Sequence, residues 1–223
     1  MPRRPASPGR TGRPPVTSRA EILTAARRLI DRDGWEKLTI RRLAAELGIG
    51  ATTLYHHIRD KEDLLIQLLN HYLTELERPE LRGTPSDRIV IAASAAHDAL
   101  KAWPWAAEVI TADGFLGLLD ESALWLVDEI LAAAADHGCT PEQSVDVFRS
   151  IWYYTVGEVI VRSRSPYRLP DGGLPTYRTA FDPARVPHLA AIGVQRWGAQ
   201  SAQDVYPRAL RVFVDGLLAQ AKS

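Results

Sequence analysis

Apolar residues along this chain recur at intervals of three and four, which is the spacing of one face of an α-helix. The clearest early stripes cover residues 19–33, 40–47 and 51–57. Later stripes predict helices over residues 60–77, 86–103, 118–137, 141–162, 187–197 and 202–221, with a short helix after Pro104. No segment alternates apolar and polar residues as a half-buried strand does, and we therefore expect an all-α protein.

Two glycines interrupt the helical pattern in the stretch LAAELGIGATTLYHHIRDKEDLL, residues 43–65. We expect Gly48 to adopt the left-handed conformation that ends a helix, because glycine has no Cβ. Ala44 is small enough for the following helix to cross closely. The expected buried wedge between the two helices consists of Leu47, Ile49 and Leu54. Two short helices joined in this way form a helix-turn-helix, whose second helix fits the major groove of DNA; an ordinary helical hairpin is the alternative.

The second helix of this motif carries hydroxyl, phenol and imidazole groups, which bind phosphates and base edges. An arginine at the start of the preceding helix and a lysine at the start of the following helix extend this surface. Backbone N–H groups at a helix N-terminus also favour phosphate. The expected DNA contacts in the motif are Arg41, Thr52, Thr53, Tyr55, His56 and Lys61.

Charge is divided unevenly along the chain, although the net charge is zero. Residues 1–59 hold 12 Lys or Arg against 5 Asp or Glu, and residues 60–223 hold 15 against 22. This division predicts a head that binds a polyanion and a body that binds something else. Proline, glycine and arginine dominate residues 1–17, which we expect to form a disordered basic arm. Arg10 and Arg13 in its GRTGRPP stretch suit an A·T-rich minor groove, and a tail that only aids solubility is the alternative.

A close resemblance to the N-terminal DNA-binding domain of the TetR family of bacterial transcription regulators lies in ILTAARRLIDRDGWEKLT and the following LTIRRLAAELGIGATTLYHHIRDKEDLL. The family's tetracycline-repressor-like C-terminal domain is similar to three later stretches, KAWPWAAEVI, VPHLAAIGVQRW and YPRALRVFVDGLLA. The resemblance implies a homodimer with a three-helix DNA-binding head and a helical body that binds a small inducer.

The resemblance implies the same six DNA contacts, which are Arg41, Thr52, Thr53, Tyr55, His56 and Lys61. Many relatives have serine or glutamate and then a polar residue where this chain has Gly50 and Ala51, so base readout would rest more on Arg41 and His56. The expected domains are a disordered basic arm over residues 1–17, a DNA-binding domain over 18–64, and a ligand-binding and dimerisation domain over 65–223.

Aromatic residues gather in the body, and a ligand pocket needs such apolar walls together with a few polar groups. Each of these residues is more often part of a core, and that alternative stays open for every one of them. The candidate ligand-binding residues are His97, Trp103, Trp125, Phe148 and Trp152. The acidic excess of the body favours a flat, neutral or cationic compound as the ligand.

Two helices of the body carry more apolar residues than one core-facing stripe requires, which predicts a dimer surface. These helices cover residues 141–162 and 202–221. The expected interface residues are Val147, Ile151, Tyr154, Phe213 and Leu217. Burial of both helices in the core of a single chain is the alternative.

Several other kinds of chemistry are disfavoured by the sequence. The single cysteine, Cys139, cannot form an intrachain disulfide or a cysteine metal cluster. His56 and His57 are adjacent on a helix and point about 100° apart, so they do not easily chelate one ion. The sequence holds no nucleophile, phosphate-binding or dinucleotide motif and no apolar stretch long enough to cross a membrane.

These observations together predict a cytoplasmic transcription regulator that binds DNA and responds to a ligand. We expect a repressor that a small-molecule inducer releases from a palindromic operator, with no cofactor, no metal and no membrane partner. A transcriptional activator and a ligand-independent DNA-binding protein are alternatives. An enzyme is disfavoured because the sequence offers no catalytic constellation.

Overall fold

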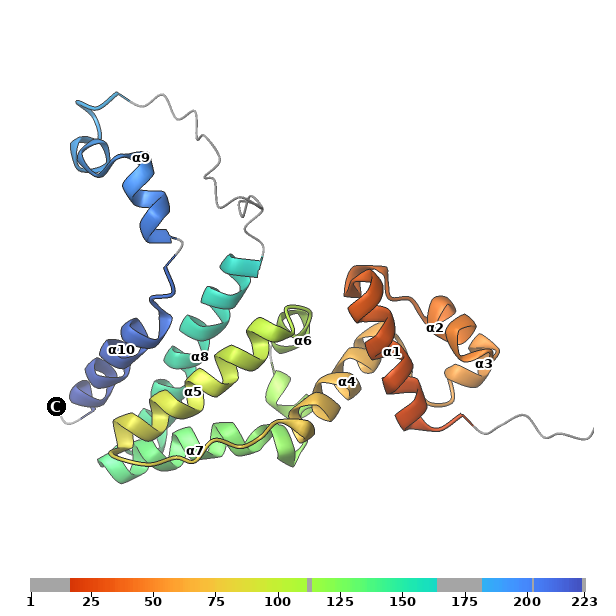
Figure 1. Ribbon diagram of the computed structural model, residues 1–223. Helices are drawn as coiled ribbons and strands as arrows, with labels where there is room; N and C mark the ends of the chain where they lie inside the picture. The colour runs from red at the N-terminus through yellow and green to blue at the C-terminus, as the bar shows by residue number, and fades with distance from the viewer. Residues whose placement is uncertain (1–16, 112–113, 164–181, 202, 222–223) are drawn as a thin grey trace, which may run out of the picture. The chain divides into compact units, whose positions relative to one another are not determined.

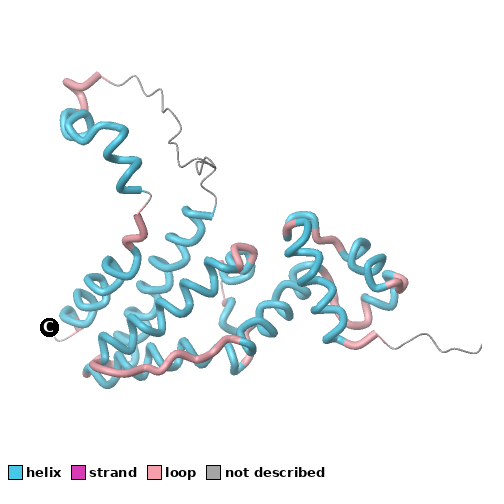
Figure 2. Tube along the Cα trace, viewed as in Figure 1, coloured by secondary structure: helices cyan, strands magenta, loops and turns pink. Residues whose placement is uncertain are grey.

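The computed structural model of the chain describes residues 17–111, 114–163, 182–201 and 203–221. All regular structure in these residues is helical, as Figure 2 shows, and the prediction of an all-α protein is confirmed. The chain forms two compact units, one ending at His71 and the other beginning at Tyr72. The domain limits expected at residues 17 and 64 stay predictions. None of the helices in the described part of the chain is long and apolar enough to cross a membrane.

The N-terminal unit consists of α1 (Arg19–Asp33), the 3₁₀ turn η1 (Trp35–Lys37), α2 (Ile40–Leu47), α3 (Ala51–Leu54) and the first part of α4 (Lys61–Glu75) (Figure 1). A capping box starts α1: the Ser18 hydroxyl accepts the Glu21 N–H at 3.2 Å, and the Glu21 carboxylate accepts the Ser18 N–H at 2.7 Å. The core of this unit contains Ile22, Leu23, Ala26, Leu29, Leu38, Leu43, Leu54, Ile58, Leu64 and Leu68.

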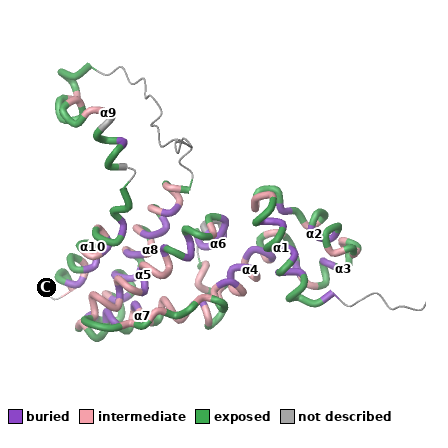
Figure 3. Tube along the Cα trace, viewed as in Figure 1, coloured by how far each residue is buried: buried purple, intermediate pink, exposed green. Residues whose placement is uncertain are grey.

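The second unit continues with α5 (Pro85–Ala102), α6 (Ala106–Ile110), the 3₁₀ turn η2 (Phe115–Leu118), α7 (Glu121–His137), α8 (Pro141–Ser163), α9 (Pro187–Ser201) and α10 (Tyr206–Gln220). Four of these helices, α5, α7, α8 and α10, pack against one another (Figure 1). Their buried faces point towards a common core (Figure 3). This core includes Ile89, Ala92, Ile130, Ala133, Val147, Phe148, Ile151, Tyr206, Leu210, Val214 and Leu218.

Capping side chains move several helix starts away from the predicted positions. Helix α5 begins at Pro85, one residue earlier than we expected, because Thr84 and Asp87 form a capping box there. Helix α7 begins at Glu121, since the Asp120 carboxylate accepts the N–H groups of Ser122 and Ala123. The segment before Asp120 is the η2 turn and not the first turn of α7.

Three other helices, α3, α9 and α10, also differ from the predictions in their limits or their course. Helix α3 ends at Leu54, and residues 55–57 form a hydrogen-bonded turn in place of a further helical turn. Helix α9 contains a kink at Gly193, whose φ of 72° is non-helical. Helix α10 begins at Tyr206, with Pro207 in the first turn, where a missing N–H costs no helical hydrogen bond.

Candidate DNA-binding surface and ligand pocket

The turn between α2 and α3 is closed by Gly48, and the left-handed conformation predicted for this residue is confirmed. Its φ is 67° and its ψ is 25°. Two backbone hydrogen bonds complete the turn, from the Gly48 N–H to the Ala45 carbonyl at 3.2 Å and from the Ile49 N–H to the Ala44 carbonyl at 3.0 Å. A Cβ added at Gly48 would meet no atom within 4 Å, so the need for glycine is conformational and not steric.

The short helix α3 buries one side and exposes the other. Leu54 is fully buried and Ala44 of α2 is also buried, whereas Leu47 and Ile49 are only half-buried. The exposed residues on and just after α3 are Thr52, Thr53, Tyr55 and His56. Tyr55 is 55% exposed. The expected DNA-contacting residues of α3 therefore share one solvent-facing surface.

Two adjacent arginines at the start of α2 have different surroundings. Both arginines are exposed to solvent. Arg42 donates to the Lys37 carbonyl at 2.9 Å and to the Asp33 carboxylate at 2.6 Å, and so ties α2 to the end of α1. Burial alone would raise the pKa of Asp33, but hydrogen bonds and the charges of Arg32 and Arg42 hold that pKa below its ordinary value. Arg42 is thus held by contacts within the unit, and we keep Arg41 as the candidate for a DNA contact.

The predicted phosphate contact Lys61 also has a structural role at the start of α4. Its ammonium group donates to the Trp35 carbonyl at 3.0 Å and lies 5.0 Å from the centre of the Trp35 ring. Asp60 caps α4, since its carboxylate accepts the Asp63 N–H at 2.8 Å. The Asp63 carboxylate accepts the Arg59 N–H at 2.8 Å, one residue earlier than a capping box requires. The other two expected contacts, Arg10 and Arg13, lie outside the described residues.

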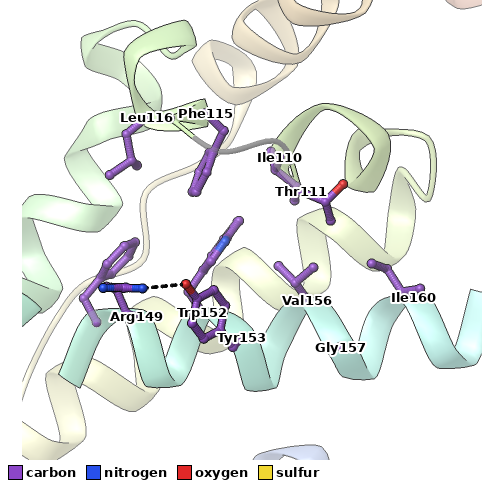
Figure 4. Close-up of a pocket in the computed structure, with 12 residues that line it drawn as sticks. Ile110, Thr111, Phe115, Leu116, Arg149, Trp152, Tyr153, Val156, Gly157 and Ile160 are labelled. Carbon is purple, nitrogen blue, oxygen red and sulfur yellow. Dashed lines mark hydrogen bonds between the residues drawn. The ribbon is translucent and has the colours of Figure 1, made fainter. Parts of the chain in front are cut away.

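A pocket of about 490 Å³ opens beside α8 in the second unit (Figure 4). Two of the predicted ligand-binding residues, Phe148 and Trp152, line it. The Trp152 ring stacks on Phe115 with 4.8 Å between centroids and on Phe148 with 6.2 Å, and the planes differ by only 14° and 16°. Arg149 donates to the Tyr153 hydroxyl at 3.0 Å, and both residues also line the pocket.

The other predicted ligand-binding residues have different neighbours and do not line this pocket. The His97 ring is buried, stacks on Tyr206 at 3.8 Å, and has its Nε2 atom 2.7 Å from the Glu158 carboxylate. Trp103 packs edge-on against Tyr72, with 4.5 Å between ring centroids. Trp125 lies under the Arg78 guanidinium at 5.0 Å. The structure therefore brings together two of the five candidates.

Sequence reasoning missed most of the described residues that line the pocket, among them Phe115 and Arg149. A usable signal existed for Arg149, which lies three and four residues before Trp152 and Tyr153 and thus on the same face of α8. Phe115 lies in the η2 turn, far from α8 in the sequence, and no local pattern connects the two.

Two family models match this chain. The model described as "Bacterial regulatory proteins, tetR family" matches residues 22–68, and the model described as "Tetracyclin repressor-like, C-terminal domain" matches residues 79–221. The chain belongs to the TetR family. The resemblance predicted from the helix-turn-helix and body sequences is thereby confirmed.

Relatives of this TetR-family chain include named transcription regulators. An HTH-type transcriptional regulator of Saccharopolyspora erythraea is 31% identical over 151 residues, which cover 67% of this chain and 62% of that protein. The HTH-type transcriptional repressor DrrR1 of Streptomyces coeruleorubidus is 29% identical over 148 residues, which cover 66% of this chain and 54% of that protein. The chain thus spans less than two thirds of these relatives' own lengths.

A solved structure extends the likeness over most of the TetR-family chain. The crystal structure of a possible TetR family transcriptional regulator from Streptomyces coelicolor A3(2) has a TM-score of 0.69 at 27% identity. The match covers 91% of this chain and 99% of that one. The arrangement of helices described above is therefore that of the family.

In this TetR-family chain, the residues expected at a dimer surface differ in how far they are buried. Val147 and Ile151 are 3% and 2% exposed and belong to the chain's own core, so the stripe predicted on α8 was in part a core stripe. Tyr154 and Leu217 are half-buried against that core. Phe213 is exposed and its ring lies 5.5 Å from that of Tyr154.

Proposed function

We propose that this chain is a ligand-responsive DNA-binding transcription regulator, and specifically a repressor that a small molecule releases from a palindromic operator. The observation that carries the proposal is the turn at Gly48, which directs Thr52, Thr53, Tyr55 and His56 to one exposed surface. Hydroxyl, phenol and imidazole groups on such a helix suit base edges and phosphates in a major groove. The name of the DrrR1 relative supports repression over activation.

The charge of the head supports DNA as its partner. Residues 1–59 hold 12 Lys or Arg against 5 Asp or Glu, and such an excess favours the phosphate backbone. Arg41 and Lys61 would bind phosphate or bases beside α3, and Arg10 and Arg13 would follow the chain into the minor groove. A regulator of this kind acts where the chromosome lies, so we place it in the cytoplasm and expect no enzymatic activity.

The pocket beside α8 supports a small-molecule ligand. Its volume of about 490 Å³ lies within the range of ligand sites, and its walls combine aromatic and aliphatic side chains with a few polar groups. The ligand has to bind the DNA-incompetent arrangement of the protein more tightly than the competent one, since equal affinities shift no equilibrium.

A homodimer is the expected assembly, because one head contacts too few base pairs to select a site in a genome. Exposed apolar side chains on α8 and α10 support it: Val161 is 71% exposed, Val212 is 69% exposed and Phe213 lies beside Val212. Gly157 and Gly216 on the same two helices have no atom within 4 Å of an added Cβ, which leaves room for a neighbouring backbone. The proposed interface omits Val147 and Ile151, which the chain itself buries.

Selection of DNA from a random pool tests the proposal. The full chain is incubated with duplexes of about 30 base pairs, and bound sequences are recovered through several rounds and sequenced. We expect a palindrome with half-sites about one helical turn or more apart, and an affinity that falls steeply as salt rises. A Tyr55→Ala variant should recover the palindrome poorly. Equal affinity for every duplex in the pool would contradict the proposal.

A further inference from the structure

The pocket beside α8 carries information about the chemistry of its ligand. We propose that this ligand is a planar aromatic carboxylate, bound with its ring along the Phe115–Trp152 wall and its carboxylate on Arg149 and Tyr153. This inference rests on the proposed function and narrows the class of molecule that acts on the regulator.

The shape of the pocket favours a planar aromatic body. Phe115, Trp152 and Phe148 form a stack in which successive planes differ by 14° and 16°, so the three rings lie nearly parallel. Ile110 and Val156 line the same space (Figure 4). A flat aromatic ring can extend such a stack or lie against the ring edges, and it gains apolar burial and aromatic contact in either position.

The polar groups of the pocket favour an anion. Arg149 is the one charged side chain among the described residues that line it, and Figure 4 shows Arg149 and Tyr153 together at one end. A guanidinium carries five N–H donors in a fixed fork that matches a carboxylate. The Tyr153 oxygen accepts one of these N–H groups at 3.0 Å, so the Tyr153 O–H can donate to a different acceptor. A carboxylate accepts from both groups, whereas an ammonium group would place like charge against Arg149.

Local charge outweighs the net charge of the body at this position. The acidic excess of residues 60–223 favours a cation on average, but exposed charges are largely screened beyond about 8–10 Å at physiological salt. A ligand in contact with Arg149 therefore responds to that guanidinium first. This reverses the neutral or cationic ligand that the overall charge suggested.

A set of matched probes tests the ligand class. Binding of 2-naphthoate, 2-naphthamide, 2-naphthylmethylammonium and octanoate to the full chain is measured by titration calorimetry. We expect 2-naphthoate to bind at least about tenfold more tightly than the amide, the ammonium compound or octanoate, which lack its charge, reverse it, or lack its ring. Octanoate keeps the carboxylate, so its weaker binding isolates the contribution of the aromatic wall.

Two variants connect this preference to the pocket. Arg149→Gln should weaken 2-naphthoate about tenfold or more and change 2-naphthamide by less than about threefold, because only the charged hydrogen bonds are lost. Arg82→Gln makes the same change in charge at an exposed arginine that does not line the pocket, and it should leave both affinities unchanged. A preference for the ammonium compound, no binding of any naphthalene probe, or an undiminished 2-naphthoate affinity in Arg149→Gln would overturn the inference.

A gel shift on the selected operator separates this inference from the proposed function. Release of DNA by 2-naphthoate, weakened in Arg149→Gln, supports both. Binding of 2-naphthoate through Arg149 without any change in operator affinity supports the ligand chemistry and contradicts the inducer role. Release of DNA by the ammonium or amide probe, with equal effect on Arg149→Gln, supports the inducer role and overturns the ligand class.

Discussion

At the scale of single residues, two neighbouring side chains of the same type can have different roles. Arg41 and Arg42 are equivalent in the sequence, since both begin α2 and both carry a charge suited to phosphate. The position of Asp33 at the end of α1 distinguishes them, because the Asp33 carboxylate accepts a hydrogen bond from the Arg42 guanidinium at 2.6 Å. That distinction depends on how α1 packs against α2, so no local sequence pattern predicts it.

Replacing each arginine in turn separates DNA binding from stability. Arg41→Ala should lower operator affinity about tenfold or more, since an exposed arginine loses a phosphate or base contact, and should leave the melting temperature unchanged. Arg42→Ala should lower the melting temperature by about 2–4 °C, because Lys37 and Asp33 lose their shared partner, and should cost less than about threefold in affinity. Gel shifts and thermal circular dichroism measure the two effects. The reverse assignment of effects would show that Arg42 is the DNA contact.

Tyr206 gives the second unit a predictable response to alkaline pH. Burial raises the pKa of Tyr206 above its ordinary 10.0, against the opposing hydrogen bond with Thr155 at 2.8 Å, and nearby Tyr154 and Glu158 add to the rise. A raised folded-state pKa means that the stabilisation is complete below pH 10 and is lost as the pH climbs towards the folded-state value. Tyr206→Phe should therefore cost about 1–2 kcal/mol near neutral pH, and this difference should shrink above pH 10. Urea unfolding of both proteins at several pH values measures it, and a constant difference would contradict the assignment.

At the scale of elements, the sequence predicts best where local groups decide. The limits of α2 follow from its Thr39 cap and from Gly48, and the structure has them where the sequence predicts them. The apolar residues of helix α8 are spread around it and do not form one stripe, so periodicity cannot say which side meets the core and which meets solvent. Val147 and Ile151 were assigned to a dimer surface for that reason, although α5 and α10 cover them.

The two glycines of the helix-turn-helix offer a matched test of local conformation. Gly48→Ser should destabilise the head by about 1–2 kcal/mol, since a φ of 67° brings a Cβ close to the following carbonyl. Gly50→Ser should change stability by less than about 0.5 kcal/mol or raise it slightly, because Gly50 has a φ of −71° and a serine hydroxyl there can cap α3. Denaturant unfolding of the two variants compares them. Equal losses of stability would contradict the claim that only position 48 requires a residue in the left-handed conformation.

At the scale of the whole molecule, assembly by distant segments limits what the sequence predicts. The proposed DNA contacts on and just after α3 lie within one short stretch, and Thr52, Thr53, Tyr55 and His56 are all exposed. The pocket combines the η2 turn with α8, which are separated by all of α7, so only Phe148 and Trp152 of its lining were among the candidates. The excess of acidic residues in residues 60–223 is likewise an average over the body, and it does not predict that Arg149 lines the pocket.

The proposed dimer depends on a surface that a single chain leaves exposed, because two heads must bind one operator together. Val212 and Phe213 supply such a surface on α10, and burying either beneath a partner removes apolar area from water. A Val212→Glu, Phe213→Glu double variant places two carboxylates there and should sediment as a monomer at micromolar concentration. Its operator affinity should fall by about 10²-fold or more, since linked binding of the second head is lost.

An Ala132→Glu, Ala135→Glu double variant adds the same charge on the exposed face of α7 and serves as the control, which should remain dimeric and bind normally. Circular dichroism establishes that both variants are folded. Loss of affinity in the folded α10 variant without a change in sedimentation would contradict the placement of the dimer interface at Val212 and Phe213. A wild-type monomer that binds the palindrome tightly would remove the need for two heads, and with it the reason to expect any interface on α10.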